Sequence, residues 1–271
     1  MQIDAPRRIG LVVPTLGERP ALLQGTLHSG RSAGADHILL VTRSAVLGEA
    51  LVGEGLVDDY CLDRDLGLAT AISDGIARLP ADIGYVNWLG DDDLLTQESL
   101  LLLRETLELG PIDIPFAFGR CLYIDVHGTK LFEMPTGKWA PFVMRVGPQL
   151  ISQPACLIRR KAYCAVGGLD TSLGWAFDLD LLIKLCLHQS PTYVRHHIAS
   201  FRWHLNSLSV KGRNKSVGEA VTVRRRYGRG IFRIFLLTSP LISRAILYAG
   251  VLVSCFGRRQ NRALENDKST P

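Results

Sequence analysis

The chain of 271 residues lacks several features that would assign it to a special class of protein. Its six cysteines are scattered, without CxxC pairs or regular spacing, and its start, MQIDAPRRIG, has no apolar signal-peptide segment. No repeat and no low-complexity linker divides it. These absences predict a reducing, cytoplasmic location and one folded domain rather than two independent ones.

The composition also lacks a strong excess of charge. Charged residues make up 21% and hydrophobic residues 47% of the chain, a balance that argues against wholesale disorder. The net charge of +5 is unevenly divided, because residues 195–271 hold 15 Lys and Arg against 3 Asp and Glu, whereas residues 1–194 hold 16 against 23. The acidic body argues against a nucleic-acid groove, and the basic tail suits phosphate groups or an anionic membrane surface.

One apolar run in the tail, residues 234–256, is long enough to span a bilayer. Pro240 and Arg244 interrupt it, and arginines lie at both ends. We therefore expect an interfacial helical hairpin or an in-plane anchor at the inner face of the membrane rather than a transmembrane helix. The alternative is a helical cap packed on the domain.

Strand-like and helix-like segments alternate along the first 110 residues. This alternation predicts an α/β fold with a Rossmann-like, doubly wound, mostly parallel sheet. After Gly110 the pattern changes to a hairpin that turns at His127-Gly128 and an amphipathic helix. The expected strands are 8–14, 37–41, 57–62 and 83–89, and the expected helices are 21–30, 68–79, 97–109 and 175–187.

The fourth expected strand ends at three consecutive carboxylates, Asp91, Asp92 and Asp93. Like charges this close repel one another unless a cation lies among them, and ligands of open parallel sheets bind beyond the carboxyl ends of the strands. The chain has neither GxGxxG nor GxxxxGK[ST], so a bound diphosphate would need a metal such as Mg²⁺ or Mn²⁺ on these carboxylates. The alternative is a solvated acidic turn that caps the next helix.

Four segments occur in an order that is typical of one enzyme family. They are DLGLATAISDG at 65–75, WLGDDDLL at 88–95, the stretch 152–185 with its GGLD and AFDLD sequences, and FRWHLNSLS at 201–209. In this order and spacing the chain resembles family 2 glycosyltransferases, the inverting enzymes of the GT-A fold. It is most similar to the rhamnosyltransferase-like, single-domain members that build bacterial surface polysaccharides.

The resemblance implies a sugar-nucleotide donor site. Asp93 matches the last aspartate of the family's DXD-type motif, which binds the metal that bridges the diphosphate. Asp92 matches its neighbour near the ribose or the metal, and Asp91 is the first aspartate of a literal D-x-D. Asp65 matches an acidic residue of the donor pocket, and Pro14-Thr15 the segment under the nucleoside base.

The resemblance also implies that Asp178 is the catalytic base. Asp180 diverges from it by about 160° on a helix, so only one of the two can face the cleft. Both can instead cap the helix. His204 matches a histidine near the metal or the diphosphate, although a structural role is the alternative. No Gln precedes Arg202-Trp203 at the QxxRW spacing of processive synthases, so the enzyme is expected to be non-processive.

Two positions depart from the family pattern. Thr42 and Arg43 stand where relatives end the second strand with an aspartate that reads uracil, which leaves a thymidine or guanosine donor open. Ser73 stands where an asparagine is expected in the third helix.

The implied reaction transfers one sugar from a nucleoside-diphosphate sugar to a hydroxyl of a saccharide or lipid-linked acceptor. The implied organisation is a GT-A domain over 1–210, with a nucleotide-binding half (1–110) and an acceptor half (111–210), followed by a basic amphipathic helical tail over 211–271. Two alternatives stay open, a sugar-nucleotide nucleotidyltransferase and a catalytically degenerate saccharide-binding or assembly subunit.

Overall fold

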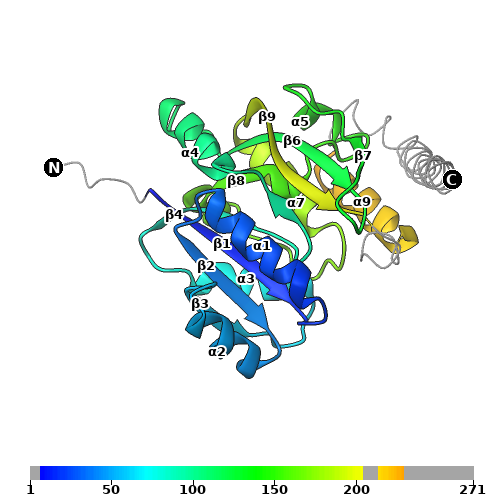
Figure 1. Cartoon of the computed structure of the whole chain (residues 1–271). Helices are drawn as coiled ribbons and strands as arrows, with labels where there is room; N and C mark the ends of the chain where they lie inside the picture. Colours follow the sequence, from blue (N-terminus) through cyan, green and yellow to red (C-terminus); the bar gives the residue numbers. More distant parts are fainter. Residues whose placement is uncertain (1–6, 204–212, 229–271) are drawn as a thin grey trace, which may run out of the picture.

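The computed structural model describes residues 7–203 and 213–228, which form layers of helices on a central sheet (Figure 1). The first part of the chain alternates strands and helices, as its pattern predicts. These elements are β1 (Arg8–Thr15), α1 (Pro20–Ser32), β2 (His37–Thr42), α2 (Ala45–Gly53), β3 (Asp59–Leu62), α3 (Leu68–Arg78) and β4 (Ile83–Trp88).

The second part is less regular. The predicted hairpin is confirmed, because β6 and β7 pair antiparallel and Gly128 turns between them with a φ of +85°. The predicted helix at 175–187 is α7. The elements are β5 (Leu94–Leu95), α4 (Ser99–Leu109), β6 (Phe116–Ile124), β7 (Lys130–Glu133), α5 (Ala140–Val143), η1 (Gln153–Ala155), β8 (Cys156–Arg159), α6 (Arg160–Ala165), α7 (Phe177–His188), β9 (Thr192–Arg202) and α9 (Arg213–Tyr227).

One sheet runs through both expected halves of the domain. Its strand order is β3-β2-β1-β4-β8-β6-β9-β5, with β7 added on β6. The first four strands are parallel, β8 is antiparallel to both of its neighbours, β9 is parallel to β6, and β5 is antiparallel to β9. The mostly parallel α/β sheet is confirmed, and its parallel strands bring the carboxyl ends of β1, β2 and β4 to the same edge.

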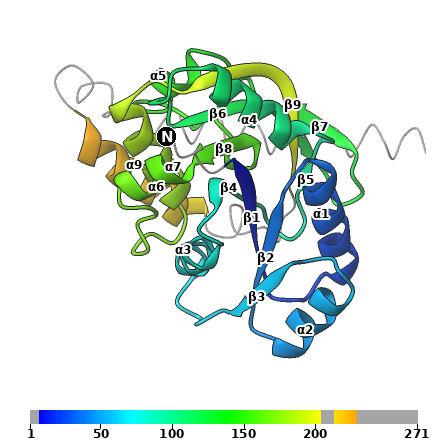
Figure 2. The ribbon, with the colours of Figure 1, turned by 90° about the vertical axis from the view of Figure 1, so that its left-hand side faces the viewer.

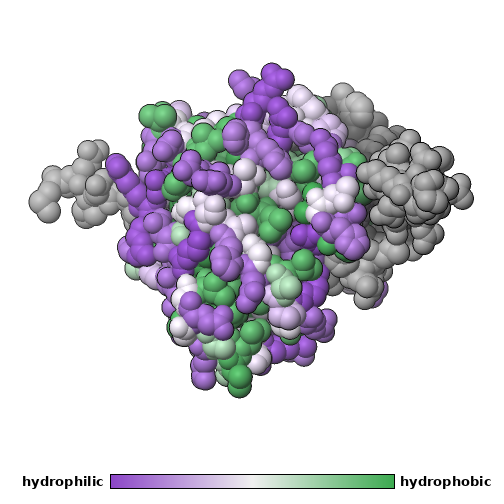
Figure 3. All heavy atoms as spheres, in the orientation of Figure 1, coloured by the Kyte–Doolittle hydropathy of each residue, from purple (hydrophilic) through white to green (hydrophobic). Residues whose placement is uncertain are grey.

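Both faces of the sheet are covered, because alternate residues of a strand point to opposite faces. Ile9, Leu11 and Val13 of β1 are fully buried in the core that α1 and α4 cover. Val12 is fully buried on the opposite face, in the core that includes α3 and α7. Figure 2 shows α1 and α3 on opposite sides of the sheet. Figure 3 shows hydrophilic residues over much of one outer face, with small apolar patches between them.

The tail expected from the sequence lies mostly outside the described residues, including the apolar run 234–256. Among the helices that the structure describes, none has the length and apolarity needed to cross a bilayer. The first helix of that tail, α9, contacts α7 of the domain.

Close packing of α3 on the sheet gives a stability test. A Cβ added at Gly75 would lie 2.6 Å from Cγ1 of Val12 and 2.9 Å from Cγ2 of Val41, which are core atoms that cannot swing aside. Gly75→Ala should therefore lower the free energy of unfolding by about 1–3 kcal/mol. Urea denaturation measures this change in the free energy of unfolding. The matched control is Gly53→Ala, also helical, where a Cβ meets nothing within 4 Å and stability should stay equal or rise by up to about 1 kcal/mol. Equal effects of the two changes would contradict the packing.

Candidate active site

The three predicted aspartates follow β4 at the edge where β1 also ends, and we call residues 91–93 the acidic tip. Asp91 is only 7% exposed, and the hydroxyl of Thr15, the last residue of β1, donates to its Oδ2 at 2.6 Å. Burial raises the pKa of Asp91, while the hydrogen bond from Thr15 and the charge of Arg19 oppose that rise. The structure therefore brings Thr15 and Asp91 together, because β1 and β4 are neighbours in the sheet.

Arg19 supplies the cation of the acidic tip. It stands just before α1, where Gly17 turns the chain with a φ of +78°. Its Nη2 lies 2.5 Å from Oδ1 of Asp91, and its Nη1 forms an ion pair with Asp92. A guanidinium presents several donors in one plane and so can hold two carboxylates at once. Sequence reasoning missed Arg19, although its place directly after the first strand was a usable signal.

Asp93 accepts a hydrogen bond from Arg202, the last residue of β9. It is 3% exposed, and its Oδ1 accepts from the main-chain N–H of Arg202 at 2.8 Å. The Arg202 guanidinium donates from Nε to the main-chain oxygen of Asp92 at 2.9 Å and from Nη1 to that of Asp125 at 2.8 Å. The pKa of Asp93 lies well above its usual range, first because of burial and then because of the nearby charge of Asp92.

These contacts decide whether the tip fits a metal ion. Carboxylate oxygens are suitable ligands for Mg²⁺ or Mn²⁺. Here, however, Arg19 holds Asp91 and Asp92, and an N–H of Arg202 holds Asp93. In residues 7–203 and 213–228 no group of three or more His, Cys, Asp or Glu is arranged to hold a metal. The acidic tip in this arrangement is a carboxylate–guanidinium cluster, and metal binding stays a prediction.

Asp178 lies in the first turn of α7, as expected. Its residue is half-buried, its Oδ2 accepts from Nε2 of Gln149 at 2.7 Å, and its Oδ1 accepts from the N–H of Leu179 at 2.7 Å. Burial raises the pKa of Asp178, and the hydrogen bond from Gln149 lowers it in part. Gln149 was missed from the sequence, because nothing in its neighbourhood indicates a contact 29 residues away.

Asp180 takes the opposite face of the helix, as helical geometry predicts. Its side chain is 1% exposed, 3.1 Å from Nζ of Lys184, and accepts from the hydroxyl of Tyr227 at 2.8 Å. The two carboxylates of AFDLD therefore have different surroundings. Asp180 is fixed between α7 and α9, whereas Asp178 accepts from two neutral donors, the amide of Gln149 and the N–H of Leu179.

Residues 149–153 connect Asp178 to the end of β4. Gln149 bonds Asp178 at one end, and at the other Gln153 donates to Oδ1 of Asn87 at 2.7 Å and to the main-chain oxygen of Trp88 at 2.9 Å. Asn87 and Trp88 are the last residues of the strand that leads into the acidic tip. One short segment thus holds both halves of the candidate site.

Tyr123 of β6 lies beside the segment 149–153 that links Asp178 to the end of β4. Its pKa is raised first by burial, then by Cys121, and also by the carboxylates of Asp93 and Asp178. Its hydroxyl lies 3.3 Å from the hydroxyl of Ser152. Tyr123 of β6 is thus in contact with the segment 149–153 through Ser152.

The other predicted site residues are less closely grouped. Pro14 precedes Thr15 at the end of β1. Asp65 follows β3, the outermost strand of the parallel part, has a φ of 58° and pairs with Arg43. Arg43 also lies 3.6 Å from Asp63. This arginine, which directly follows β2, therefore interacts with two carboxylates of the loop after β3. His204 lies outside the described residues.

Comparisons with known proteins support the fold. No family model matches the chain, and no curated protein matches it. Among solved structures, it matches the crystal structure of S. aureus TarS at 10% identity and a TM-score of 0.56, covering 79% of this chain and 39% of that chain. S. aureus TarS 1-349 in complex with UDP matches at 10% identity and a TM-score of 0.58, covering 80% of this chain and 64% of that chain.

A further crystal structure of S. aureus TarS 1-349 matches at 11% identity and a TM-score of 0.52, covering 80% of this chain and 65% of that chain. This chain thus spans less than two thirds of the length of these TarS chains. At this level of identity the matches show the fold alone: the chain is a mixed α/β domain with a mostly parallel sheet that is similar to the fold of the TarS glycosyltransferase.

The raised pKa of Asp178 gives a test of the site that needs no substrate. Because the folded protein binds this proton more tightly than the unfolded chain, the ionised carboxylate costs stability at neutral pH. Asp178→Asn keeps an oxygen that can accept from Gln149 and should raise Tm at about pH 7. The gain should shrink as pH falls and vanish below the ordinary aspartate pKa of about 4.

The matched control on the same helix is Asp180→Asn. It removes the charge that pairs with Lys184 and should lower the free energy of unfolding by about 1–3 kcal/mol at neutral pH. Thermal denaturation across pH measures both variants. A loss of stability at neutral pH in Asp178→Asn would contradict the burial described above.

Proposed function

We propose that the protein is an inverting glycosyltransferase that moves one sugar from a nucleoside-diphosphate sugar to a hydroxyl of a saccharide or lipid-linked acceptor. The observation that carries the proposal is the link from Asp178 through residues 149–153 to the end of β4 and the acidic tip. The glycosyltransferase fold, seen in TarS with UDP, supports it. Production of surface polysaccharide is the role that the sequence resemblance favours.

Asp178 is the residue proposed to act as the base. In its ionised form the carboxylate accepts the proton of the acceptor hydroxyl while that oxygen forms a bond to the anomeric carbon. The bond from that carbon to the diphosphate breaks at the same time, so the configuration inverts and no covalent enzyme intermediate is needed. The raised pKa of Asp178 suits this task, because it makes the carboxylate a stronger proton acceptor.

Residues at the carboxyl ends of β1, β3 and β4 are proposed to bind the donor. Thr15 is already in contact with the acidic tip, and Pro14 lies beside it on β1. Asp92 and Asp65 are proposed to bind the nucleoside part. No carboxylate ends β2, and Arg43, the next residue, pairs with Asp65. We therefore keep thymidine and guanosine beside uridine as candidates for the donor nucleoside.

Metal dependence is proposed from the sequence and not from the arrangement of the carboxylates. An ion at Asp91, Asp93 and His204 would supply positive charge for the leaving diphosphate. In the present arrangement Arg19 pairs with Asp91, one of these proposed ligands, and with the neighbouring Asp92.

A nucleotide panel tests the proposed function. The diphosphates of uridine, thymidine and guanosine should be compared by thermal shift with and without Mn²⁺, and one of them should raise Tm. With the matching sugar nucleotide, Asp178→Asn should lower turnover by roughly 10²- to 10⁴-fold while keeping the nucleotide-induced shift. Asp113→Asn, an exposed aspartate on the loop before β6, is the control and should resemble the wild type.

Three outcomes would count against this reading. Full turnover in Asp178→Asn would remove the base. Binding of a nucleotide without hydrolysis or transfer would favour a degenerate saccharide-binding subunit. Full turnover in the presence of a chelator would overturn metal dependence and leave Arg19 as the cation at the tip.

We also propose peripheral binding to the inner face of a membrane, on the basic composition of residues 195–271. The full-length protein should float with vesicles that contain anionic lipid and not with neutral vesicles, because the attraction is electrostatic. Replacement of Arg229, Arg233, Arg244, Arg258 and Arg259 by Gln should abolish flotation. Flotation that is equal with neutral vesicles, or unchanged in the substituted protein, would overturn the proposal.

A further inference from the structure

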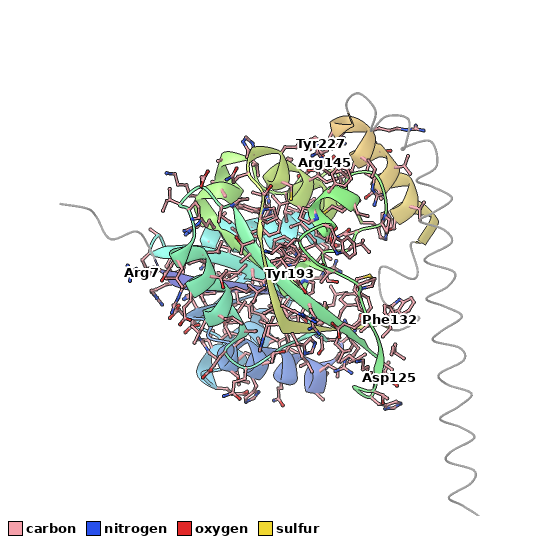
Figure 4. All side chains as sticks on the ribbon, turned by 90° about the horizontal axis from the view of Figure 1, so that it is seen from above. Arg7, Asp125, Phe132, Arg145, Tyr193 and Tyr227 are labelled. Atoms are coloured by element: carbon pink, nitrogen blue, oxygen red, sulfur yellow. The ribbon has the colours of Figure 1, made fainter. Side chains whose placement is uncertain are left out.

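Helix α9 follows the motif-bearing part of the sequence, yet it lies against α7, the helix that carries Asp178. Val223 of α9 is fully buried, and Nη1 of Arg226 lies 2.5 Å from Oδ2 of Asp170. The hydroxyl of Tyr227 donates to Asp180 at 2.8 Å. Figure 4 labels Tyr227, the last residue of α9. The contact joins α9 to the side of α7 that faces away from the candidate site.

Glu219 of α9 extends this contact to the start of α7. Its Oε1 accepts from the N–H of Gly174 at 3.0 Å, and its Oε2 accepts from the N–H groups of Trp175 at 2.8 Å and Ala176 at 2.9 Å. Ala176 is the N-cap of α7 and offers no side-chain cap of its own. A helix start leaves its first N–H groups unpaired and favours a negative charge. Glu219, from another helix, caps the N–H of Ala176 and also holds the N–H groups of the two residues before it.

This cap lies next to the candidate base in the sequence. The three N–H groups belong to residues 174–176, and Asp178 follows two residues after Ala176. Hydrogen bonds to three consecutive N–H groups fix the main chain that leads directly into the first turn of α7. Glu219 therefore fixes the turn from which Asp178 points.

A second contact from α9 is made to the segment that precedes Gln149, the side-chain hydrogen-bond donor of Asp178. Nε of Arg224 donates to the main-chain oxygen of Met144 at 3.1 Å, and burial lowers the pKa of Arg224 to about 10. Met144 follows α5, five residues before Gln149, whose amide holds Asp178. One helix thus holds both the turn that bears the carboxylate and the segment that leads to its hydrogen-bond donor.

We propose that Glu219 is a positioning residue for Asp178, so that α9 is part of the catalytic unit although the sequence motifs end before it. The inference rests on the proposed glycosyltransferase function. Glu219 is proposed to contact neither the sugar nucleotide nor the acceptor substrate and to act only through α7. Its loss should therefore change turnover and leave the binding of the donor nucleotide unchanged.

The test compares Glu219→Gln and Glu219→Asp with the wild type in the full chain. Glu219→Gln loses the charge and one acceptor oxygen, so kcat should fall roughly 10- to 100-fold while KM for the donor stays within about twofold. Glu219→Asp keeps the charge and should restore part of the lost kcat. Glu105→Gln, which removes an exposed carboxylate on α4, is the matched control and should keep wild-type kcat and Tm.

The contrary outcomes are distinct from one another. An unchanged kcat in a Glu219→Gln protein with lowered Tm would make Glu219 a mere anchor of α9 and overturn the inference. A parallel loss of kcat and of the nucleotide-induced thermal shift would also overturn it, because the damage would then extend beyond Asp178. A wild-type protein without turnover and without a nucleotide-induced shift would instead overturn the proposed function and the inference together.

Discussion

The burial of consecutive carboxylates at the end of β4 is the constraint on which the site depends. Ionised groups removed from water are costly unless a cation or hydrogen-bond donors compensate them. The compensation comes from two arginines far apart in the sequence, Arg19 before α1 and Arg202 at the end of β9. The strand order makes this possible, because β1 lies beside β4 and β9 pairs with β5 directly after the tip.

The same physical rule separates the two aspartates of α7. Asp180 is the more deeply buried, and it is compensated by Lys184 and Tyr227. Among the described residues, the hydrogen-bond partners of Asp178 are both neutral, the side-chain amide of Gln149 and the main-chain N–H of Leu179. A carboxylate held by neutral donors keeps more of its ability to accept a proton than one that is paired with a cation. Position on the helix and the nature of the partners together decide which aspartate is suited to act as a base.

The sequence predicted the elements whose patterns are local. β1, β2, β4, α3 and α4 follow from apolar periodicity, and the β6–β7 hairpin follows from its Gly128 turn. The pattern did not predict α2, whose start is nevertheless signalled by the N-cap Ser44, which accepts from the N–H of Leu47. The short β5 and the antiparallel β8 were also missed, because two to four residues carry too little periodicity.

Sequence motifs predicted the acidic residues of the candidate site but not the residues that form hydrogen bonds and ion pairs with them. The acidic tip and Asp178 occur in motifs that can be read along the chain. Arg19, Gln149 and Glu219 contact partners that lie 29 to 73 residues away in the sequence, and no local pattern records such pairings. Charge can be located from a sequence, whereas its compensation is a property of the folded sheet.

The bond between the N–H of Arg202 and Asp93 has a consequence for the growing polypeptide. It joins groups separated by 109 residues, and the last strand of the sheet must leave the ribosome before it can form. Until then the buried aspartate lacks its main-chain donor, and the acidic tip is incomplete. A nascent chain that holds only the parallel strands is therefore an unfinished half of the molecule.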